Sequence, residues 1–224
     1  MPVDLRLYAI VDPEHAGGRS LPELANLVAA GGATLVQLRD KISDTRAMIE
    51  TARAVKAALK PFGVPLLIND RVDVALAAQA DGVHVGQTDM APQDARQLLG
   101  RDAIIGLSVK STALAEAAPI ELIDYVGIGG VYATTSKDNP NPPIGVDGLA
   151  RIVGVFRRRY PNFPTCAIAG INASNAGATI AAGADGVSVI SALSLAPDPT
   201  AAAKAMRAVV DAALEARARP KGEQ

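Results

Sequence analysis

Short apolar runs alternate with stretches of helical periodicity along the whole chain. The apolar runs end in polar residues or glycine, as buried strands do, and the stretches between them repeat apolar positions at helical spacing. Strands are expected at residues 7–12, 34–40, 65–70, 82–87, 103–109, 125–133, 165–170 and 186–190. Helices are expected at 22–30, 45–59, 72–78, 92–99, 148–156, 173–182 and 200–216, and a weaker helical pattern covers 112–118.

This alternation predicts the fold class. Near-continuous apolar strands separated by helices are typical of a parallel sheet covered by helices, and eight strand–helix pairs are the number that closes a (β/α)8 TIM barrel of ~250 residues. An open doubly wound sheet competes, but no glycine-rich dinucleotide loop follows the first strand, where Asp12 leads into Pro13. We therefore predict an α/β fold, a parallel eight-stranded barrel with outer helices, as one domain over residues 1–224 with a frayed tail at 217–224.

A short motif recurs where helices lead into strands. Residues 80–85, Ala-Asp-Gly-Val-His-Val, return at 184–189 as Ala-Asp-Gly-Val-Ser-Val. A duplicated half-barrel would produce such an echo. Convergence of short turns on the same chemistry would also produce it, because glycine supplies the left-handed stop of the helix. The sequence leaves both explanations open.

Two aspartates lie at the ends of the third and fourth predicted strands. Because parallel strands joined by a helix end at the same edge of a sheet, the carboxylates of Asp70 and Asp89 are expected close together. Such a pair suits Mg²⁺, which keeps several waters and takes further ligands from substrate phosphates. Each aspartate alone is better explained as the cap of the following helix. Beside Asn69 and Gln87, the pair favours a metal site.

The second predicted strand ends in alternating polar residues. Since side chains alternate along a strand, Gln37, Arg39 and Lys41 share one face, while Val36 and Leu38 share the other. In a barrel the apolar face meets the helices, so the polar face points into the mouth, where its cations suit phosphate oxygens. Surface charges at a fraying strand end are the alternative, and the regular alternation argues against it.

Two further segments carry groups that bind anions. Glycines precede the run Thr134-Thr135-Ser136-Lys137, which follows the sixth strand and begins a long irregular segment, 134–147. Segments of this length often form lids or binding loops. Glycines, hydroxyl groups and a lysine together suit phosphate oxygens. The loops after strands seven and eight, where barrels often bind phosphate, contain Gly170 and Ile190-Ser191. Plain turn chemistry, with capping by Asn172 and Ser191, explains much of the same sequence.

No nucleophilic or acid–base pair is evident. Ser108 should face the mouth but lacks an obvious histidine and acid partner. His84 is expected to be a core histidine satisfied by a neighbour, and Cys166 to be small-residue packing. Anion sites with a metal and no such pair favour a reaction driven by leaving-group stabilisation, such as displacement of pyrophosphate.

Composition narrows the class of protein. Lys plus Arg number 22 against 23 Asp plus Glu, a net charge of -1 that lacks the basic surplus of nucleic-acid binders. A single cysteine fits a reducing compartment. No signal-peptide pattern opens the chain, and no apolar run reaches the ~20 residues of a membrane span. We expect a cytoplasmic protein of small-molecule substrates with no membrane or nucleic-acid partner; a homo-oligomer stays open.

The ordered motifs resemble those of thiamine-phosphate synthases. The matching stretches are Gln37-Leu38-Arg39-Asp40-Lys41, Asn69-Asp70, residues 84–89 (His-Val-Gly-Gln-Thr-Asp), Gly106-Leu107-Ser108, Thr134-Thr135-Ser136-Lys137, Gly170 and Ile190-Ser191. The resemblance implies a (β/α)8 barrel transferase that joins hydroxymethylpyrimidine pyrophosphate to a thiazole phosphate and releases pyrophosphate. It also implies a dissociative route, in which pyrophosphate leaves, the aminopyrimidine stabilises the carbocation and the thiazole nitrogen attacks.

The resemblance implies roles for individual residues as well. Asp70 and Asp89 would hold Mg²⁺. The pyrimidine pyrophosphate would contact Gln37, Leu38, Arg39, Asp40, Lys41, Asn69, Ser108 and Lys137, and the thiazole phosphate would contact Thr134, Thr135, Ser136, Gly170, Ile190 and Ser191. Arg39, Lys41, Ser108 and Lys137 are the residues to which catalysis is assigned.

One loop departs from the family pattern, and three other functions compete. Relatives commonly carry proline before the aromatic residue of the loop at 127–133 and again before the threonine, and the stretch 138–143 is unusual, so the contacts of this lid stay open. A thiazole tautomerase-like relative would lack the complete cationic strand and the metal aspartates. A non-catalytic phosphate sensor would leave those cations and aspartates unexplained. A phosphosugar isomerase would need an acid–base pair at the mouth, and the sequence shows no convincing one.

Overall fold

The computed structural model describes residues 3–136 and 142–219, which form a closed parallel barrel. The strands follow one another around the barrel in sequence order, and the last pairs with the first. They are β1 (Leu7–Val11), β2 (Leu35–Leu38), β3 (Leu66–Asn69), β4 (Gly82–Val85), β5 (Ile104–Val109), β6 (Tyr125–Ile128), β7 (Thr165–Ile168) and β8 (Gly186–Val189). The predicted (β/α)8 class is confirmed, although most strands end earlier than predicted because residues such as Asp12, Asp40 and Asp70 already belong to loops.

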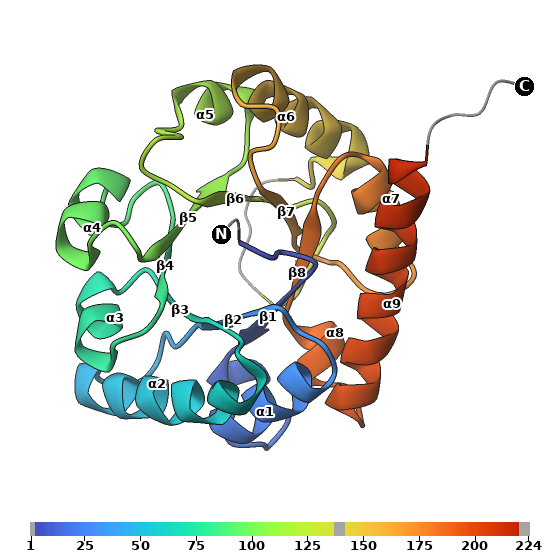
Figure 1. Ribbon diagram of the computed structural model, residues 1–224. Coiled ribbons are helices and arrows are strands. Elements are labelled where there is room, and N and C mark those ends of the chain that lie inside the picture. Colours follow the sequence, from blue (N-terminus) through green and yellow to red (C-terminus); the bar gives the residue numbers. More distant parts are fainter. Residues whose placement is uncertain (1–2, 137–141, 220–224) are drawn as a thin grey trace, which may run out of the picture.

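Helices surround the barrel as an outer ring (Figure 1). They are α1 (Leu21–Ala30), α2 (Thr45–Leu59), α3 (Val72–Ala78), α4 (Pro92–Leu99), α5 (Thr112–Ala117), α6 (Gly145–Arg159), α7 (Ala176–Ala181), α8 (Ser191–Ser194) and α9 (Pro199–Ala218), with 3-10 turns at Pro13–His15 and Lys60–Phe62. The sequence did not predict α8, which is too short to show a period. Within the described residues, none of the helices combines the length and the apolar character that a membrane span requires.

The predicted tail at 217–224 is wrong at its start. Arg217 lies within α9, where its guanidinium donates to the carbonyls of Ile180 and Ala184 and pairs with Asp185 at 3.1 Å. These long-range contacts continue the helix to Ala218, and nothing in the local sequence reports them. Residues 220–224 lie outside the described part of the chain.

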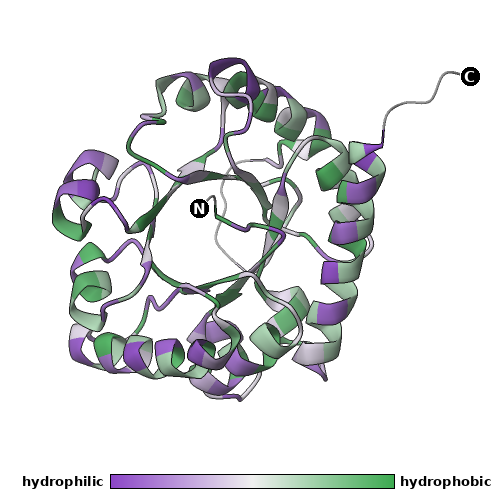
Figure 2. Cartoon of the chain, in the orientation of Figure 1, coloured by the Kyte–Doolittle hydropathy of each residue, from purple (hydrophilic) through white to green (hydrophobic). Residues whose placement is uncertain are grey.

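The two faces of each strand serve different cores. Alternate residues such as Leu7, Ala9 and Val11 pack outward against the helices in the main hydrophobic cluster. In Figure 2 the barrel strands are mostly green, whereas purple hydrophilic residues are frequent on the helices. A smaller cluster fills the inside of the barrel at its amino end, made by Leu5, Tyr8, Leu35, Leu67, Tyr125 and Cys166. These side chains fill the amino end of the barrel, so the space for a ligand lies toward the carboxyl end.

One glycine is required by the inner cluster. A Cβ on Gly106 of β5 would lie 2.2 Å from the ring of Tyr125, which is its register partner on β6. The missing side chain therefore provides the space that Tyr125 occupies inside the barrel.

Polar residues at the amino end join the strands in pairs. The side chain before each even-numbered strand accepts the backbone N–H at the start of the preceding odd strand: Thr34 from Leu7, Asp81 from Leu66, Asp124 from Ile105 and Asp185 from Thr165. The sequence echo at Asp81 and Asp185 therefore reflects a turn that all four strand pairs use, and a duplicated half-barrel is not needed to explain it.

Candidate active site

Asp70 and Asp89 come together at the carboxyl end of the barrel, as predicted. Asp70 directly follows β3 and adopts a left-handed backbone conformation with φ 60°, and Asp89 follows β4. Partial burial, with the neighbouring Asp70 carboxylate adding to it, raises the pKa of Asp89, while the Gly86 N–H and Lys41 act in the opposite direction. Like charges brought this close favour a bound cation.

The capping interpretation of these aspartates is wrong. The N-cap positions of α3 and α4 are occupied by Arg71 and Ala91, and neither helix has a capping hydrogen bond from a side chain. Asp89 instead accepts the backbone N–H of Gly86 at 2.7 Å, which closes the loop after β4. The carboxylate of Asp70 pairs with the ammonium group of Lys41.

The polar face of β2 points into the barrel, as its alternation predicted. Gln37 is buried and donates from its amide to the hydroxyl of Tyr8, and Arg39 pairs with the fully buried Asp12 at the end of β1. Arg39 keeps further N–H groups for a ligand because one nitrogen binds Asp12. Two acidic side chains thus hold Arg39 and Lys41 at the mouth.

The side chains of Leu38 and Asp40, the other two residues predicted on this strand, make structural contacts. Leu38 packs in the outer core, as its place on the apolar face requires. Asp40 accepts the backbone N–H groups of Ile42 and Ser43 at 3.1 and 2.9 Å, which turns the chain toward α2.

Ser108 has a histidine partner that the sequence did not reveal. Its hydroxyl lies 2.9 Å from Nε2 of His84, whose Nδ1 lies 2.8 Å from the hydroxyl of Tyr125. His84 is therefore a buried histidine satisfied by neighbours, as expected. Its second nitrogen faces a phenol, so within residues 3–136 and 142–219 the contact that orients this histidine is a hydroxyl, where the base of an activated serine has a carboxylate. Asn69 ends β3 in register with His84.

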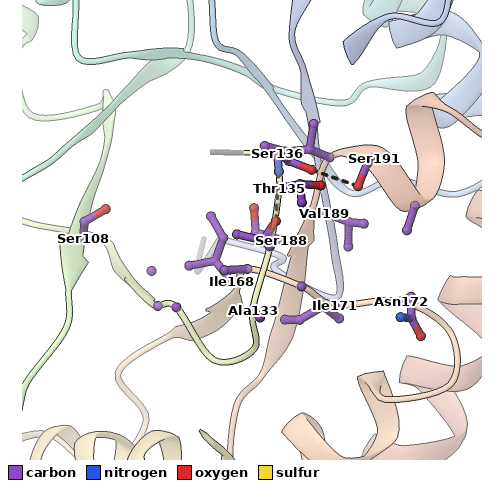
Figure 3. A pocket seen from close by; sticks show the side chains of 18 of the residues that line it. Ser108, Ala133, Thr135, Ser136, Ile168, Ile171, Asn172, Ser188, Val189 and Ser191 are labelled. Atoms are coloured by element: carbon purple, nitrogen blue, oxygen red, sulfur yellow. Dashed lines mark hydrogen bonds between the residues drawn. The ribbon is translucent and has the colours of Figure 1, made fainter. Parts of the chain in front are cut away.

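The loops after β5 to β8 line a cavity of about 620 Å³ beside these groups. Every described residue predicted to hold the thiazole phosphate lines it: Thr134, Thr135, Ser136, Gly170, Ile190 and Ser191. Figure 3 shows Ser108 on one side of the cavity and Ser136 and Ser191 together on the other, joined by a 2.9 Å hydrogen bond. Lys137 lies outside the described residues.

Gly170 is needed where two of these loops meet. It has φ +66°, and a Cβ there would lie 2.4 Å from the carbonyl oxygen of Ala133. The loop after β7 can thus approach the hydroxyl-bearing loop only with glycine at this position. Ala169, beside it, also has a positive φ of 83°.

Sequence reasoning missed four polar residues of the barrel interior. Tyr8, Asp12, Tyr125 and Ser188 all lie on inward faces of the strands, where their period-two spacing was a usable signal. The Ser188 hydroxyl is buried at the cavity wall and has no hydrogen-bond partner among the described residues. Cys166 is small-residue packing, as expected: burial raises the pKa of its thiol well above the usual range.

Asp70 and Asp89 offer two carboxylates to a cation at this rim. In residues 3–136 and 142–219, no three His, Cys, Asp or Glu side chains gather as a metal cluster. Mg²⁺ needs only one or two carboxylates when a substrate phosphate and waters complete its shell, so Asp70 and Asp89 fit that ion.

Comparisons with known proteins agree on one family. Residues 7–193 match the family described as thiamine monophosphate synthase. The thiamine-phosphate synthase of Agrobacterium fabrum is 51% identical over 96% of this chain and 98% of its own length. That of Azorhizobium caulinodans is 45% identical over 94% and 97%. A solved structure of thiamine phosphate pyrophosphorylase from Pyrococcus furiosus is similar with a TM-score of 0.82 at 34% identity, over 95% of this chain and 98% of that one.

Proposed function

The chain belongs to the thiamine monophosphate synthase family, a transferase of thiamine synthesis, and from this premise we propose its substrates and the origin of its catalysis. The enzyme joins 4-amino-5-hydroxymethyl-2-methylpyrimidine pyrophosphate to a thiazole phosphate, giving thiamine phosphate and pyrophosphate. The observation that carries this proposal is the gathering of Arg39, Lys41, Asp70 and Asp89 at one rim, next to a separate cavity lined by hydroxyl groups.

The pyrimidine pyrophosphate binds at the mouth between β2 and β5. Its diphosphate carries several negative charges, which the forked N–H groups of Arg39 and the ammonium of Lys41 stabilise. Gln37, Asn69 and Ser108 supply neutral hydrogen-bonding groups around it, and Lys137 follows the hydroxyl loop in sequence. The backbone of Leu38 and Asp40 completes this strand end.

Asp70 and Asp89 would hold Mg²⁺ at the same rim. Bound there, Mg²⁺ would neutralise charge on the departing diphosphate. Lys41 already pairs with Asp70, so its ammonium group lies beside the carboxylates that would hold the metal ion.

The thiazole phosphate occupies the 620 Å³ cavity. The hydroxyls of Ser136 and Ser191 and the backbone around Gly170 and Ile190 are suited to phosphate oxygens. Because Ser108 lines the same cavity, the two substrates lie next to each other, and the thiazole nitrogen can face the carbon that it attacks.

The reaction is a displacement whose barrier comes mainly from the departure of the diphosphate. The bond between the methylene carbon and the diphosphate oxygen breaks, and its electron pair leaves with the diphosphate. The thiazole nitrogen then forms the new carbon–nitrogen bond with its own lone pair. The protein needs no activated nucleophile for this chemistry, and cationic groups fixed at the position of the developing charge lower the barrier.

The test is to incubate the protein with both phosphorylated halves, with and without EDTA, and to measure pyrophosphate and thiamine phosphate. We expect both products with Mg²⁺ and neither with EDTA. The variant Lys41→Gln should release pyrophosphate about 10–100-fold more slowly, because a cation at the leaving group is lost. Lys60→Gln, which changes an exposed lysine in the 3-10 turn before β3, is the matched control and should behave as wild type.

Two outcomes would overturn the proposal. Rearrangement of the thiazole phosphate without release of pyrophosphate would favour a thiazole tautomerase-like activity. Binding of both phosphates without any product would favour a phosphate-binding barrel protein that does not couple them.

A further inference from the structure

A continuous line of buried polar side chains crosses the barrel beneath the mouth. Gln37 binds the hydroxyl of Tyr8, whose oxygen lies 2.9 Å from that of Tyr125. Tyr125 binds Nδ1 of His84, and Nε2 of His84 binds Ser108. The line begins and ends at residues that we assign to the pyrimidine pyrophosphate, and its middle members are closed off from solvent.

The ring of His84 is held in place on several sides. It lies in a tilted arrangement against Tyr125, with ring centroids 5.6 Å apart, and edge-on to Tyr8 at 6.5 Å. A Cβ on Gly127 would come within 3.1 Å of its Cε1. A ring fixed in this way presents Nε2 to Ser108 in one orientation, so the serine hydroxyl is fixed as well.

We propose that His84 is a positioning residue, which acts through Ser108 and sets the direction of the serine hydroxyl toward the diphosphate. The inference rests on the proposed function, because it needs the diphosphate at Ser108. It assigns His84 no contact with substrate and no proton transfer.

The chemistry of the ligand determines which nitrogen of His84 carries the proton. A diphosphate oxygen only accepts hydrogen bonds, so Ser108 must donate its proton to it and accept one from Nε2–H. In the neutral ring Nδ1 is then an acceptor, and the freely rotating hydroxyl of Tyr125 donates to it. In the structure the Tyr125 hydroxyl donates to Tyr8, and Tyr8 also accepts from the Gln37 amide. With the diphosphate bound, the two phenol hydroxyls rotate so that Tyr8 donates to Tyr125 and Tyr125 to Nδ1, and each hydroxyl of the line then donates once and accepts once.

The first test replaces each nitrogen separately. His84→Gln places an amide near Nε2 and keeps a partner for Ser108, whereas His84→Asn places one near Nδ1 and keeps a partner for Tyr125. We expect kcat to fall about 30-fold in His84→Asn, as in Ser108→Ala, and only about threefold in His84→Gln. The double variant Ser108→Ala/His84→Asn should be no slower than Ser108→Ala alone, because residues that act through each other are not additive.

Equal losses in the two His84 variants, or losses that multiply in the double variant, would overturn the proposal. If His84→Asn does not fold, Tyr125→Phe removes only the hydroxyl that binds Nδ1. It should lower kcat while leaving the KM for the thiazole phosphate unchanged, and wild-type kcat in that variant would contradict the account.

A binding measurement separates this inference from the proposed function. Calorimetry with Mg²⁺ and inorganic pyrophosphate needs no turnover, and His84→Asn should weaken binding as much as Ser108→Ala does, while His84→Gln should not. The chain has only 2 histidines, so ¹⁵N labelling reports the tautomer directly. Pyrophosphate should give a His84 signal protonated at Nε2; protonation at Nδ1 would overturn the assignment, even in a protein that couples its substrates.

Discussion

Two buried serines should respond to truncation in opposite directions. The Ser188 hydroxyl has no partner among the described residues, whereas that of Ser194 donates to the Ile190 carbonyl at 3.0 Å. Ser188→Ala should raise the free energy of unfolding by about 1 kcal/mol, and Ser194→Ala should lower it by about 1 kcal/mol. Urea unfolding of the two variants measures this difference, and an equal loss in both would show that Ser188 is hydrogen-bonded.

Single residues of the mouth were predictable where a local period indicated them. Gln37, Arg39 and Lys41 alternate along the chain, and that alternation alone placed them at the mouth of the barrel. Their partners were not predictable, because they come from other strands: Tyr8 and Asp12 from β1 and its end, and Asp70 after β3. The same limit hid the partner of Ser108, since its contact with His84 exists only once β4 and β5 lie side by side.

At the scale of elements, the sequence predicted the kind and order of helices and strands better than their ends. The helix expected at 148–156 spans Gly145–Arg159, and its carboxyl end is extended because Arg157 and Arg159 donate to carbonyls of other segments. The helix expected from 173 begins at Ala176, because the Asn175 side chain accepts the N–H of Asn172 and forms a turn first. Long-range and side-chain bonds of this kind leave no periodic signal.

Glycines within elements offer a test of the packing. Gly106→Ala should destabilise the protein by about 1–3 kcal/mol, because its Cβ overlaps the Tyr125 ring. Gly177→Ala in α7 is the matched change: the nearest atom to its Cβ is 4.0 Å away, and alanine should stabilise the helix by about 0.5–1 kcal/mol. Thermal unfolding compares them, and a stable Gly106→Ala variant would contradict the described fit of Tyr125.

At the scale of the whole molecule, the two ends of the barrel carry different groups, those of the candidate site at one end and structural hydrogen bonds at the other. The carboxyl end carries the paired carboxylates, the cations and the cavity. The amino end carries the polar turns before the even strands, three of which add a cation: Lys56 on Asp81, Arg96 on Asp124 and Arg157 on Asp185. The eightfold alternation predicted this architecture, whereas the pairing of strands by these turns is visible only in three dimensions.

Changes at the amino end should therefore affect stability and not turnover. Asp185 accepts from Thr165 and pairs with both Arg157 and Arg217. Asp185→Asn should lower the free energy of unfolding by about 1–3 kcal/mol, while kcat per folded molecule stays at the wild-type value. Glu116→Gln, which removes the exposed partner of Arg158, should change stability by less than about 0.5 kcal/mol. A loss of kcat in Asp185→Asn with intact fold would show that the two ends are coupled.

The central claim is that one rim holds two carboxylates for a cation beside the cations that receive a departing diphosphate. The most direct measurement is the rate of pyrophosphate release against Mg²⁺ concentration for Asp89→Asn, which keeps an oxygen for the Gly86 N–H but loses the charge. Asp102→Asn, in an exposed turn before β5, is the control. The account predicts that Asp89→Asn needs at least about tenfold more Mg²⁺ for half-maximal rate, and an unchanged Mg²⁺ dependence would contradict it.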